Sequence, residues 1–200
     1  MTDSQRSNND CKSKFSRSLV CETQERQFGL IHIYCGHGKG KTTAGIGLIV
    51  RAAGHGRRVL LVQFLKDGLS GELDSLRMLR DVRILAGQVT ANFTFDMNSA
   101  EKAATLALHH GFFGQAVDLA RQGQIDLLVL DEVIGAINTG TLTQDVVLDF
   151  LRTKPDDLEV VLTGRDPSPQ LLELADYISD IQCVRHPYQR GITAREGIEY

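Results

Sequence analysis

A glycine-rich turn between an apolar run and a helix-like segment constrains this chain more than any other feature. The apolar run covers residues 30–34, the turn reads Gly36-His37-Gly38-Lys39-Gly40-Lys41-Thr42-Thr43, and a helix-like segment extends from residue 42 to residue 53. Glycines let the backbone turn sharply with several N–H groups pointing inward, and a helix N-terminus adds the positive end of its dipole. The sequence therefore predicts a strand, a phosphate-binding loop and a helix, in that order.

The residues of this turn have distinct expected roles at a nucleotide. Lys41 is expected to place a positive charge against the phosphates, and the Thr42 hydroxyl to ligate magnesium. The strict pattern G-x-x-x-x-G-K-[ST] lacks its first glycine, because Cys35 stands there. The nucleotide-binding residues expected in the turn are Gly36, His37, Gly38, Lys39, Gly40, Lys41, Thr42 and Thr43, with His37 acting through its backbone N–H. A purely structural turn is the alternative interpretation.

Apolar strands alternate with helical segments along the rest of the chain. We expect strands at 30–34, 58–65, 82–85, 125–130, 159–162 and 181–184, and helices at 42–53, 72–80, from 99 onward, and at 133–137, 144–151 and 168–177. Near-continuous apolar strands joined by helices indicate a parallel sheet with helices on both faces. We therefore predict a P-loop NTPase-like (RecA-like) α/β fold of about six strands, with one domain at 28–200. Residues 1–27 are predicted to be a mobile N-terminal extension and a possible lid.

A second candidate binding element is the apolar run 127–130, which ends in Asp131 and Glu132. We expect this strand to lie beside the strand that enters the phosphate loop. The two carboxylates would then face the magnesium ion, directly or through water. The alternative is that either acid only caps the helix that follows.

Composition and charge exclude several classes of protein. The 200 residues carry a net charge of −3, which gives no general attraction to nucleic acid or acidic lipid. No apolar stretch approaches the length of a bilayer span, and the polar residues 4–14 do not resemble a secretory signal. The sequence therefore predicts a cytoplasmic protein without a membrane or nucleic-acid partner. Its four cysteines form no C-x-x-C pair, and we expect them to be free thiols.

Several motifs together resemble the phosphate-loop family of ATP:cob(I)alamin (corrinoid) adenosyltransferases. The matching segments are Gly36 to Thr43, Arg51-Ala52-Ala53-Gly54-His55-Gly56, Val62-Gln63-Phe64 with Lys66, Phe93-Thr94-Phe95-Asp96, Leu130-Asp131-Glu132, Leu162-Thr163-Gly164-Arg165, His186-Pro187-Tyr188 and Gly191 to Tyr200. The resemblance spans residues 28–200. Cys35 stands where this family usually has threonine, so the missing glycine agrees with the resemblance.

The resemblance implies transfer of the 5′-deoxyadenosyl group of ATP to the Co(I) of a corrinoid, with release of tripolyphosphate, in adenosylcobalamin synthesis or salvage. Cobalt is then the nucleophile, and the protein positions the substrates and stabilises the leaving group. Lys41 would act on the triphosphate, Arg51 would contact the nucleotide, and Thr42, Asp131 and Glu132 would hold Mg²⁺ or Mn²⁺. A homodimer and a flavoprotein reductant are further implications.

The resemblance also implies a role for two aromatic residues, Phe93 and Phe95. They would press on the lower face of the corrin and displace its lower ligand, which makes a four-coordinate Co(II) that is easier to reduce. The best-known relatives have tryptophan where Phe95 stands, so this chain keeps the apolar bulk but lacks the indole N–H. The alternative is that both rings fill the core.

Other functional classes would use the same loop differently. A kinase or ATPase would transfer a phosphoryl group and yield ADP, and a non-catalytic carrier would bind nucleotide and corrinoid without turnover. A nucleic-acid motor is disfavoured because the acidic chain has no basic stripe. The His109-His110 pair could suggest a metal site, but adjacent helix residues point in different directions, so we expect a solvated helix surface there.

Overall fold

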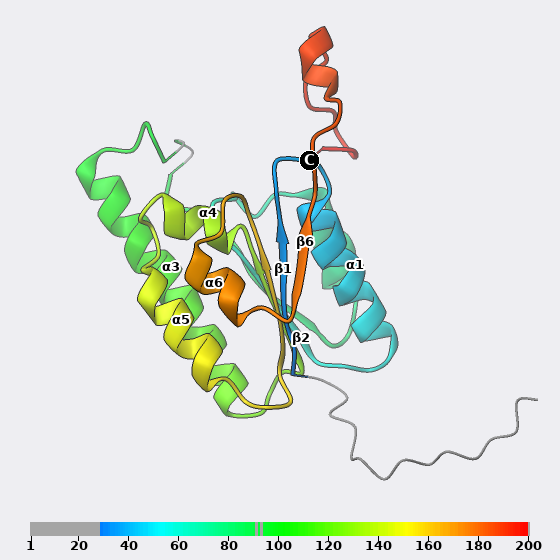
Figure 1. Cartoon of the computed structure of the whole chain (residues 1–200), viewed down its shortest axis with the longest axis vertical. Coiled ribbons are helices and arrows are strands. Elements are labelled where there is room, and N and C mark those ends of the chain that lie inside the picture. The colour runs from blue at the N-terminus through cyan, green and yellow to red at the C-terminus, as the bar shows by residue number, and fades with distance from the viewer. Residues whose placement is uncertain (1–28, 91, 93, 200) are drawn as a thin grey trace, which may run out of the picture.

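The computed structural model describes residues 29–199 except 91 and 93, and these form one parallel sheet with helices on both faces (Figure 1). The strands are β1 (Ile31–Cys35), β2 (Val59–Gln63), β3 (Val82–Leu85), β4 (Leu127–Asp131), β5 (Glu159–Thr163) and β6 (Tyr177–Asp180). Their order is β3-β2-β4-β5-β1-β6, and every pairing is parallel. The predicted P-loop NTPase-like (RecA-like) α/β fold is confirmed.

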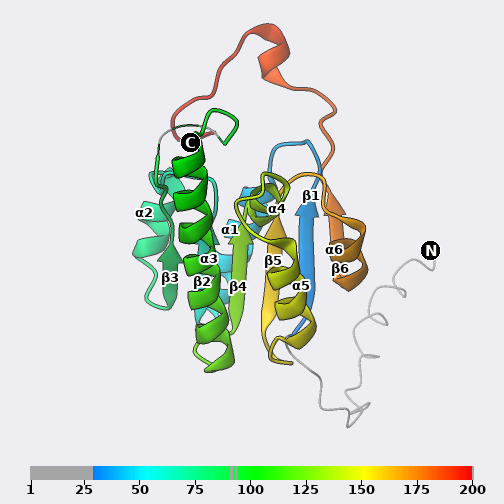
Figure 2. The ribbon, with the colours of Figure 1, turned by 90° about the vertical axis from the view of Figure 1, so that its left-hand side faces the viewer.

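The helices divide between the two faces of the sheet and bury two separate apolar clusters. One face carries α1 (Lys41–Gly54) and α2 (Gly71–Arg77). The other carries α3 (Ser99–Arg121), α4 (Val133–Asn138), α5 (Gln144–Thr153) and α6 (Pro169–Leu174) (Figure 2). The central strands β2 and β4 are buried at every position, as expected for strands covered on both faces. No helix in the described part of the chain is long and apolar enough to span a membrane.

The sixth strand lies earlier in the chain than the sequence indicated. It was predicted at 181–184, whereas β6 occupies Tyr177–Asp180 and α6 already ends at Leu174. All four side chains of β6 are exposed, because this strand forms one edge of the sheet and pairs only with β1 among the described strands. A search for buried apolar runs therefore misses it.

The strand that carries the two acids is not adjacent to the strand that enters the phosphate loop. The sequence predicted that they would be neighbours, but β5 lies between β4 and β1. The apolar pattern of a buried strand contains no information on which strand it pairs with, so this prediction was wrong. The consequence is that Thr163, at the end of β5, stands between the loop and Asp131.

The long helix α3 begins at Ser99, as expected, and its first turn carries a complete capping box. The Asn98 side chain accepts a hydrogen bond from the Glu101 N–H, and the Glu101 carboxylate accepts one from the Asn98 N–H. This arrangement satisfies two N–H groups that the first turn of a helix leaves without partners.

His109 is buried in the core, which contradicts the expected solvated surface. Its ring is 1% exposed, meets Phe64 edge to face at 5.1 Å, and has Nδ1 3.1 Å from the Thr141 hydroxyl. Burial lowers the pKa of His109 to about 4, because the charged imidazolium would lose its hydration. The neighbouring His110 is only half-buried.

The buried His109 predicts a stability that decreases in mild acid. The ring is neutral in the folded state, whereas its usual pKa of 6.5 applies in the unfolded chain. The contribution of the neutral His109 ring to the free energy of unfolding is therefore fully present above pH 6.5. It is lost as the pH falls toward 4, by up to about 3 kcal/mol. When unfolding by denaturant is measured at several pH values, the free energy of unfolding should depend less on pH in His109→Gln than in the control His110→Gln. Identical slopes in the two variants would contradict this account.

Candidate functional site

The phosphate loop connects β1 to α1 at the carboxyl edge of the sheet and holds Lys41 inward. The Lys41 side chain is 7% exposed, and its ammonium donates to the Gly38 carbonyl at 2.8 Å. Burial, assisted by the positive charge of Arg165, lowers the pKa of Lys41, while Glu132 and Asp131 oppose that shift. The loop therefore keeps a poorly hydrated cation at its centre, where an anion would interact with it strongly.

Two glycines of the loop are required by the end of β6 and the segment that follows it. A Cβ on Gly36 would lie 2.2 Å from the Asp180 carboxylate, and a Cβ on Gly38 would lie 2.7 Å from the backbone oxygens of Ile181 and Gln182. The Gly38 N–H also donates to the Ile181 carbonyl at 2.7 Å. The loop is thus fixed by close backbone contacts on one side, and the Gly38 N–H is engaged by Ile181 in this structure.

Asp131 connects the loop helix to the neighbouring strands. Its carboxylate is 1% exposed and accepts hydrogen bonds from the Thr42 hydroxyl at 2.9 Å and the Thr163 hydroxyl at 2.7 Å. The Lys66 ammonium donates to the other carboxylate oxygen at 2.8 Å. Thr42 and Asp131, both predicted to serve the metal, are therefore brought together by the fold.

Glu132 occupies the N-cap position of α4 but does not cap the helix with its side chain. Its backbone is in the left-handed region at φ 58°, its N–H donates to the Thr163 hydroxyl at 2.9 Å, and no side-chain capping bond forms. Burial and the negative charge of Asp131 raise the pKa of Glu132, whereas Lys66, Lys41 and Arg165 lower it. The capping alternative is thus not seen for this carboxylate, which faces a cluster of positive charges.

The oxygen atoms at this edge fit Mg²⁺ or Mn²⁺ better than a soft metal. The Thr42 hydroxyl and the carboxylates of Asp131 and Glu132 are hard donors of the kind that these ions prefer. Beside them, the buried Gln63 Oε1 has no hydrogen-bond partner among the described residues, so it could accept from a metal-bound water. The described residues include no group of three or more His, Cys, Asp or Glu that could hold a metal, so the nucleotide would have to supply further ligands.

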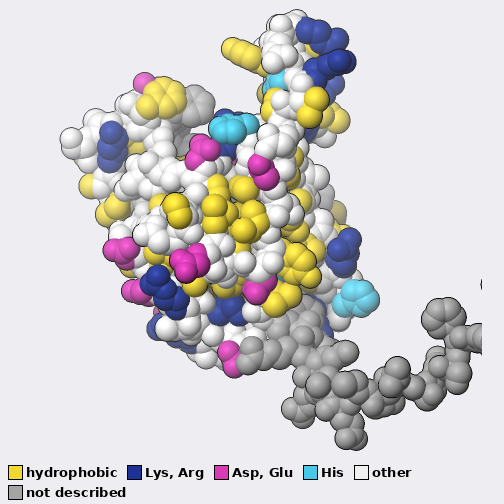
Figure 3. Space-filling view, viewed as in Figure 1, with side chains coloured by type: hydrophobic (Ala, Val, Ile, Leu, Met, Phe, Trp, Pro, Cys, Tyr) yellow, Lys and Arg dark blue, Asp and Glu magenta, His cyan; other side chains and the backbone are white. Residues whose placement is uncertain are grey.

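The C-terminal segment returns to the phosphate loop. After β6 the chain arches above the carboxyl edge of the sheet through the short helix η1 (Pro187–Arg190), and arginine side chains gather on this projection (Figures 2 and 3). It then brings Glu199 to within 2.8 Å of the Lys39 ammonium. The Arg195 guanidinium, followed by Lys39, lowers the pKa of Glu199 to about 2, so this carboxylate is charged at neutral pH.

The contact between Glu199 and Lys39 predicts that the tail competes with phosphate. Because solvent screens exposed ion pairs and leaves them weak, Glu199→Gln should tighten binding of Mg²⁺–tripolyphosphate only about two- to fivefold in isothermal titration. Glu196→Gln is the matched control, because it removes the same charge from the same segment. Weaker binding in the Glu199 variant would instead mean that Glu199 holds Lys39 in its binding position.

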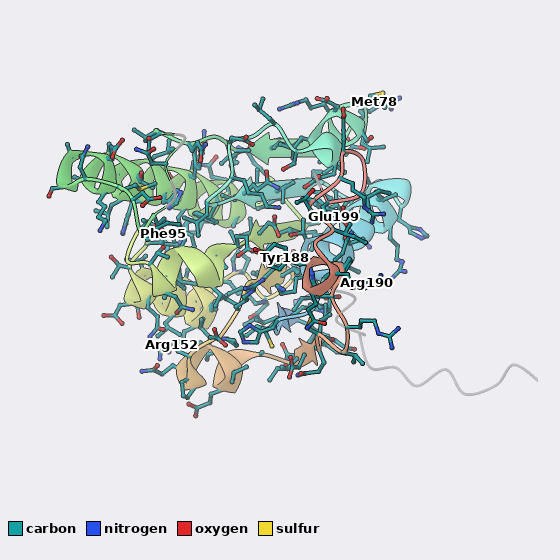
Figure 4. All side chains as sticks on the ribbon, turned by 90° about the horizontal axis from the view of Figure 1, so that it is seen from above. Met78, Phe95, Arg152, Tyr188, Arg190 and Glu199 are labelled. Carbon is teal, nitrogen blue, oxygen red and sulfur yellow. The ribbon has the colours of Figure 1, made fainter. Side chains whose placement is uncertain are left out.

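Several predicted site residues lie apart from this cluster. The His37 ring is exposed and points to Asp166 at 3.3 Å, which agrees with a backbone role, and Thr43 is exposed on α1. Arg51 lies in the last turn of α1, ten residues and about 15 Å along the axis from Lys41, so its nucleotide contact stays a prediction. Phe95 is 78% exposed on the β3–α3 loop and lies apart from Tyr188 in the view from above (Figure 4), so it does not fill the core. Phe93 lies outside the described residues.

Sequence reasoning assigned no role to Lys66, Gln63, Thr163 or Glu199, although each belongs to a matching motif. Gln63 and Thr163 are the last residues of β2 and β5, and a polar residue at the end of a buried apolar strand is a usable signal. Lys66 lies three residues beyond β2 and could have been found in the same way. Glu199 could not, because only the folded tail brings it to the loop.

Comparisons with known proteins agree with this geometry. Residues 27–200 match the family described as ATP:corrinoid adenosyltransferase BtuR/CobO/CobP. A corrinoid adenosyltransferase of Sinorhizobium sp is 31% identical over 94% of this chain and 88% of its own length. The corrinoid adenosyltransferases of Escherichia coli K12 and Salmonella typhimurium LT2, the latter called CobA, are 33% and 36% identical, each over 90% of both chains.

Proposed function

Because this chain belongs to the ATP:corrinoid adenosyltransferase family, we propose that its phosphate loop holds the triphosphate of ATP as a leaving group and not as a phosphoryl donor. The chain is an enzyme that transfers the adenosyl group of ATP to a corrinoid. The observation that carries the proposal is the inward-held Lys41 beside the bonded pair of Thr42 and Asp131.

The reaction forms one bond and breaks one bond, and the protein acts on the second. Co(I) attacks C5′ of the ribose, a cobalt–carbon bond forms, and the electron pair of the C5′–O bond leaves with the triphosphate. Lys41, the remaining loop N–H groups and the N-terminal dipole of α1 stabilise the charge that develops on the departing oxygen. No side-chain nucleophile takes part, so the protein contributes position and electrostatics.

We assign the metal to Thr42, Asp131 and Glu132. Mg²⁺, when bound, neutralises part of the triphosphate charge. The hydrogen bond between the Thr42 hydroxyl and Asp131 fixes these two ligands relative to each other. Burial and the negative charge of Asp131 raise the pKa of Glu132, and three nearby cationic side chains lower it. The donor chemistry and the pairing of these side chains support this assignment.

A product assay distinguishes adenosyl transfer from phosphoryl transfer. The enzyme is incubated with ATP, Mg²⁺ and a chemically reduced corrinoid, and the products are separated by anion exchange while the visible spectrum reports the cobalt–carbon bond. We expect tripolyphosphate and adenosylated corrinoid in equal amounts. ADP with inorganic phosphate and an unaltered corrinoid would contradict the proposal.

Further parts of the proposal rest on the family. Phe93 and Phe95 would contact the lower corrin face, and the exposure of Phe95 at the carboxyl edge leaves its ring accessible to a substrate. Arg51 and the loop residues Gly36, His37, Gly38, Lys39, Gly40 and Thr43 would contact the nucleotide. We also propose a cytoplasmic homodimer that receives electrons from a flavoprotein. Light scattering tests the dimer, and reduction of bound Co(II) by a purified flavoprotein tests the electron donor.

A further inference from the structure

An unusual backbone conformation places Lys66 against Thr42 and Asp131, two of the proposed metal ligands. The preceding residue, Leu65, has φ 56°, which is the left-handed region that a leucine rarely adopts. Such strain persists only where the surrounding structure holds it, and it is concentrated at functional positions. Here the turn follows β2 and brings the Lys66 ammonium to 2.8 Å from Asp131 Oδ2 and 3.4 Å from the Thr42 hydroxyl.

Lys66 supplies the charge that balances a buried carboxylate. Asp131 accepts hydrogen bonds from four side chains in the described part of the chain, namely Thr42, Gln63, Lys66 and Thr163. Three of these donors are neutral, so the Lys66 ammonium alone among them brings a positive charge. A buried carboxylate without a paired cation is strongly unfavourable.

A divalent cation would need the same oxygens that Lys66 now contacts. An ammonium group and a metal ion cannot both lie against Asp131 without strong repulsion, because like charges a few ångströms apart in a partly buried site interact strongly. The Lys66 ammonium has a second carboxylate available, because Glu72 Oε1 lies 3.8 Å away. The same oxygen accepts a hydrogen bond from the Gln63 side-chain amide at 3.4 Å.

We infer that Lys66 is a positioning residue that stands in for the metal. Without a bound metal its ammonium would hold Asp131 and the Thr42 hydroxyl in place, and it would withdraw when a divalent cation arrives with the triphosphate. This inference rests on the proposed metal site and adds to it the order in which the metal and the nucleotide bind. The metal binds weakly to the free protein and well together with the nucleotide, whose negative charge also attracts the displaced ammonium.

The test is direct binding of Mn²⁺ to the full-length protein without nucleotide, measured from the electron paramagnetic resonance signal of free Mn²⁺. We expect Lys66→Met to lower the dissociation constant for Mn²⁺ about tenfold. Lys66→Arg keeps the cation and should bind Mn²⁺ as weakly as the unaltered protein. Circular dichroism and thermal unfolding verify that each variant is folded.

Arg165→Met is the matched control for a general change in charge. The Arg165 charge acts on both Lys41 and Glu132, so it lies near the site, but its side chain is not among the donors to Asp131. Equal tightening in Lys66→Met and Arg165→Met would overturn the inference, and so would no tightening in Lys66→Met.

A second titration separates failure of this inference from failure of the proposed metal site. The unaltered protein is titrated with Mn²⁺ in the presence of tripolyphosphate, and ultrafiltration separates the Mn²⁺ held by the protein from Mn²⁺–tripolyphosphate in solution, with a protein-free sample as the reference. If Mn²⁺ binds there but Lys66→Met binds it no more tightly without tripolyphosphate, only the role of Lys66 is wrong. If tripolyphosphate brings no Mn²⁺ to the unaltered protein, the metal site and the inference are both wrong.

Discussion

Replacement of Lys41 by alanine is expected to slow adenosyl transfer by on the order of 100-fold or more. The Lys41 ammonium is buried and held across the loop before substrate arrives, so little reorganisation is needed when charge develops on the leaving triphosphate. Water that replaces this side chain would not restore an oriented charge in a partly buried site. The measurement is a single-turnover rate that starts from chemically prepared Co(I), with saturating ATP and Mg²⁺.

Lys39→Ala is the matched control for Lys41, because it removes the same charge from the same loop. The Lys39 side chain is half-exposed and contacts the C-terminal segment through Glu199 and the Ile198 carbonyl. We therefore expect a loss much smaller than that of Lys41→Ala, since solvent screens an exposed charge. Near-normal turnover of Lys41→Ala, or equal losses in the two variants, would remove the special role assigned to Lys41.

The second large effect is expected at Phe95, and it should depend on the oxidation state of the cobalt. Phe95→Ala should slow the reaction that starts from Co(II) about 100-fold, because a misplaced reacting group typically reduces a rate by about this factor. The reaction that starts from Co(I) should change little, because the aromatic is proposed to act on reduction. A visible spectrum of the variant with ATP, Mg²⁺ and Co(II) corrinoid should lack the four-coordinate species.

Val89→Ala is a suitable control for Phe95, because Val89 is an exposed apolar residue in the same segment between β3 and α3. We expect this variant to retain the four-coordinate spectrum. Equal losses from Co(II) and Co(I) in Phe95→Ala would show that the ring only helps to bind the corrinoid. The structure already excludes the core-filling alternative for Phe95, since the ring is largely exposed.

Local sequence predicted most of the elements because their signals are local. The run from residue 30 to residue 53 contains a buried strand, a glycine turn and a helix start, and β1, the loop and α1 lie there. The same holds for β2, β4 and β5, whose apolar residues are buried on both faces. The edge strand β6 was misplaced, because its exposed side chains give a weaker signal.

The sequence by itself determined the strands and the glycine turn, and from them it predicted the kind of site, since Lys41, Thr42, Asp131 and Glu132 follow apolar strands. Only the tertiary structure decided how they are connected. The order of the strands places Thr163 between the loop and Asp131, the turn at Leu65 brings Lys66 to the same carboxylate, and the folded tail pairs Glu199 with Lys39. The physical reason is that residue type and spacing govern local conformation, whereas contacts between distant segments depend on how the whole chain buries its apolar surface.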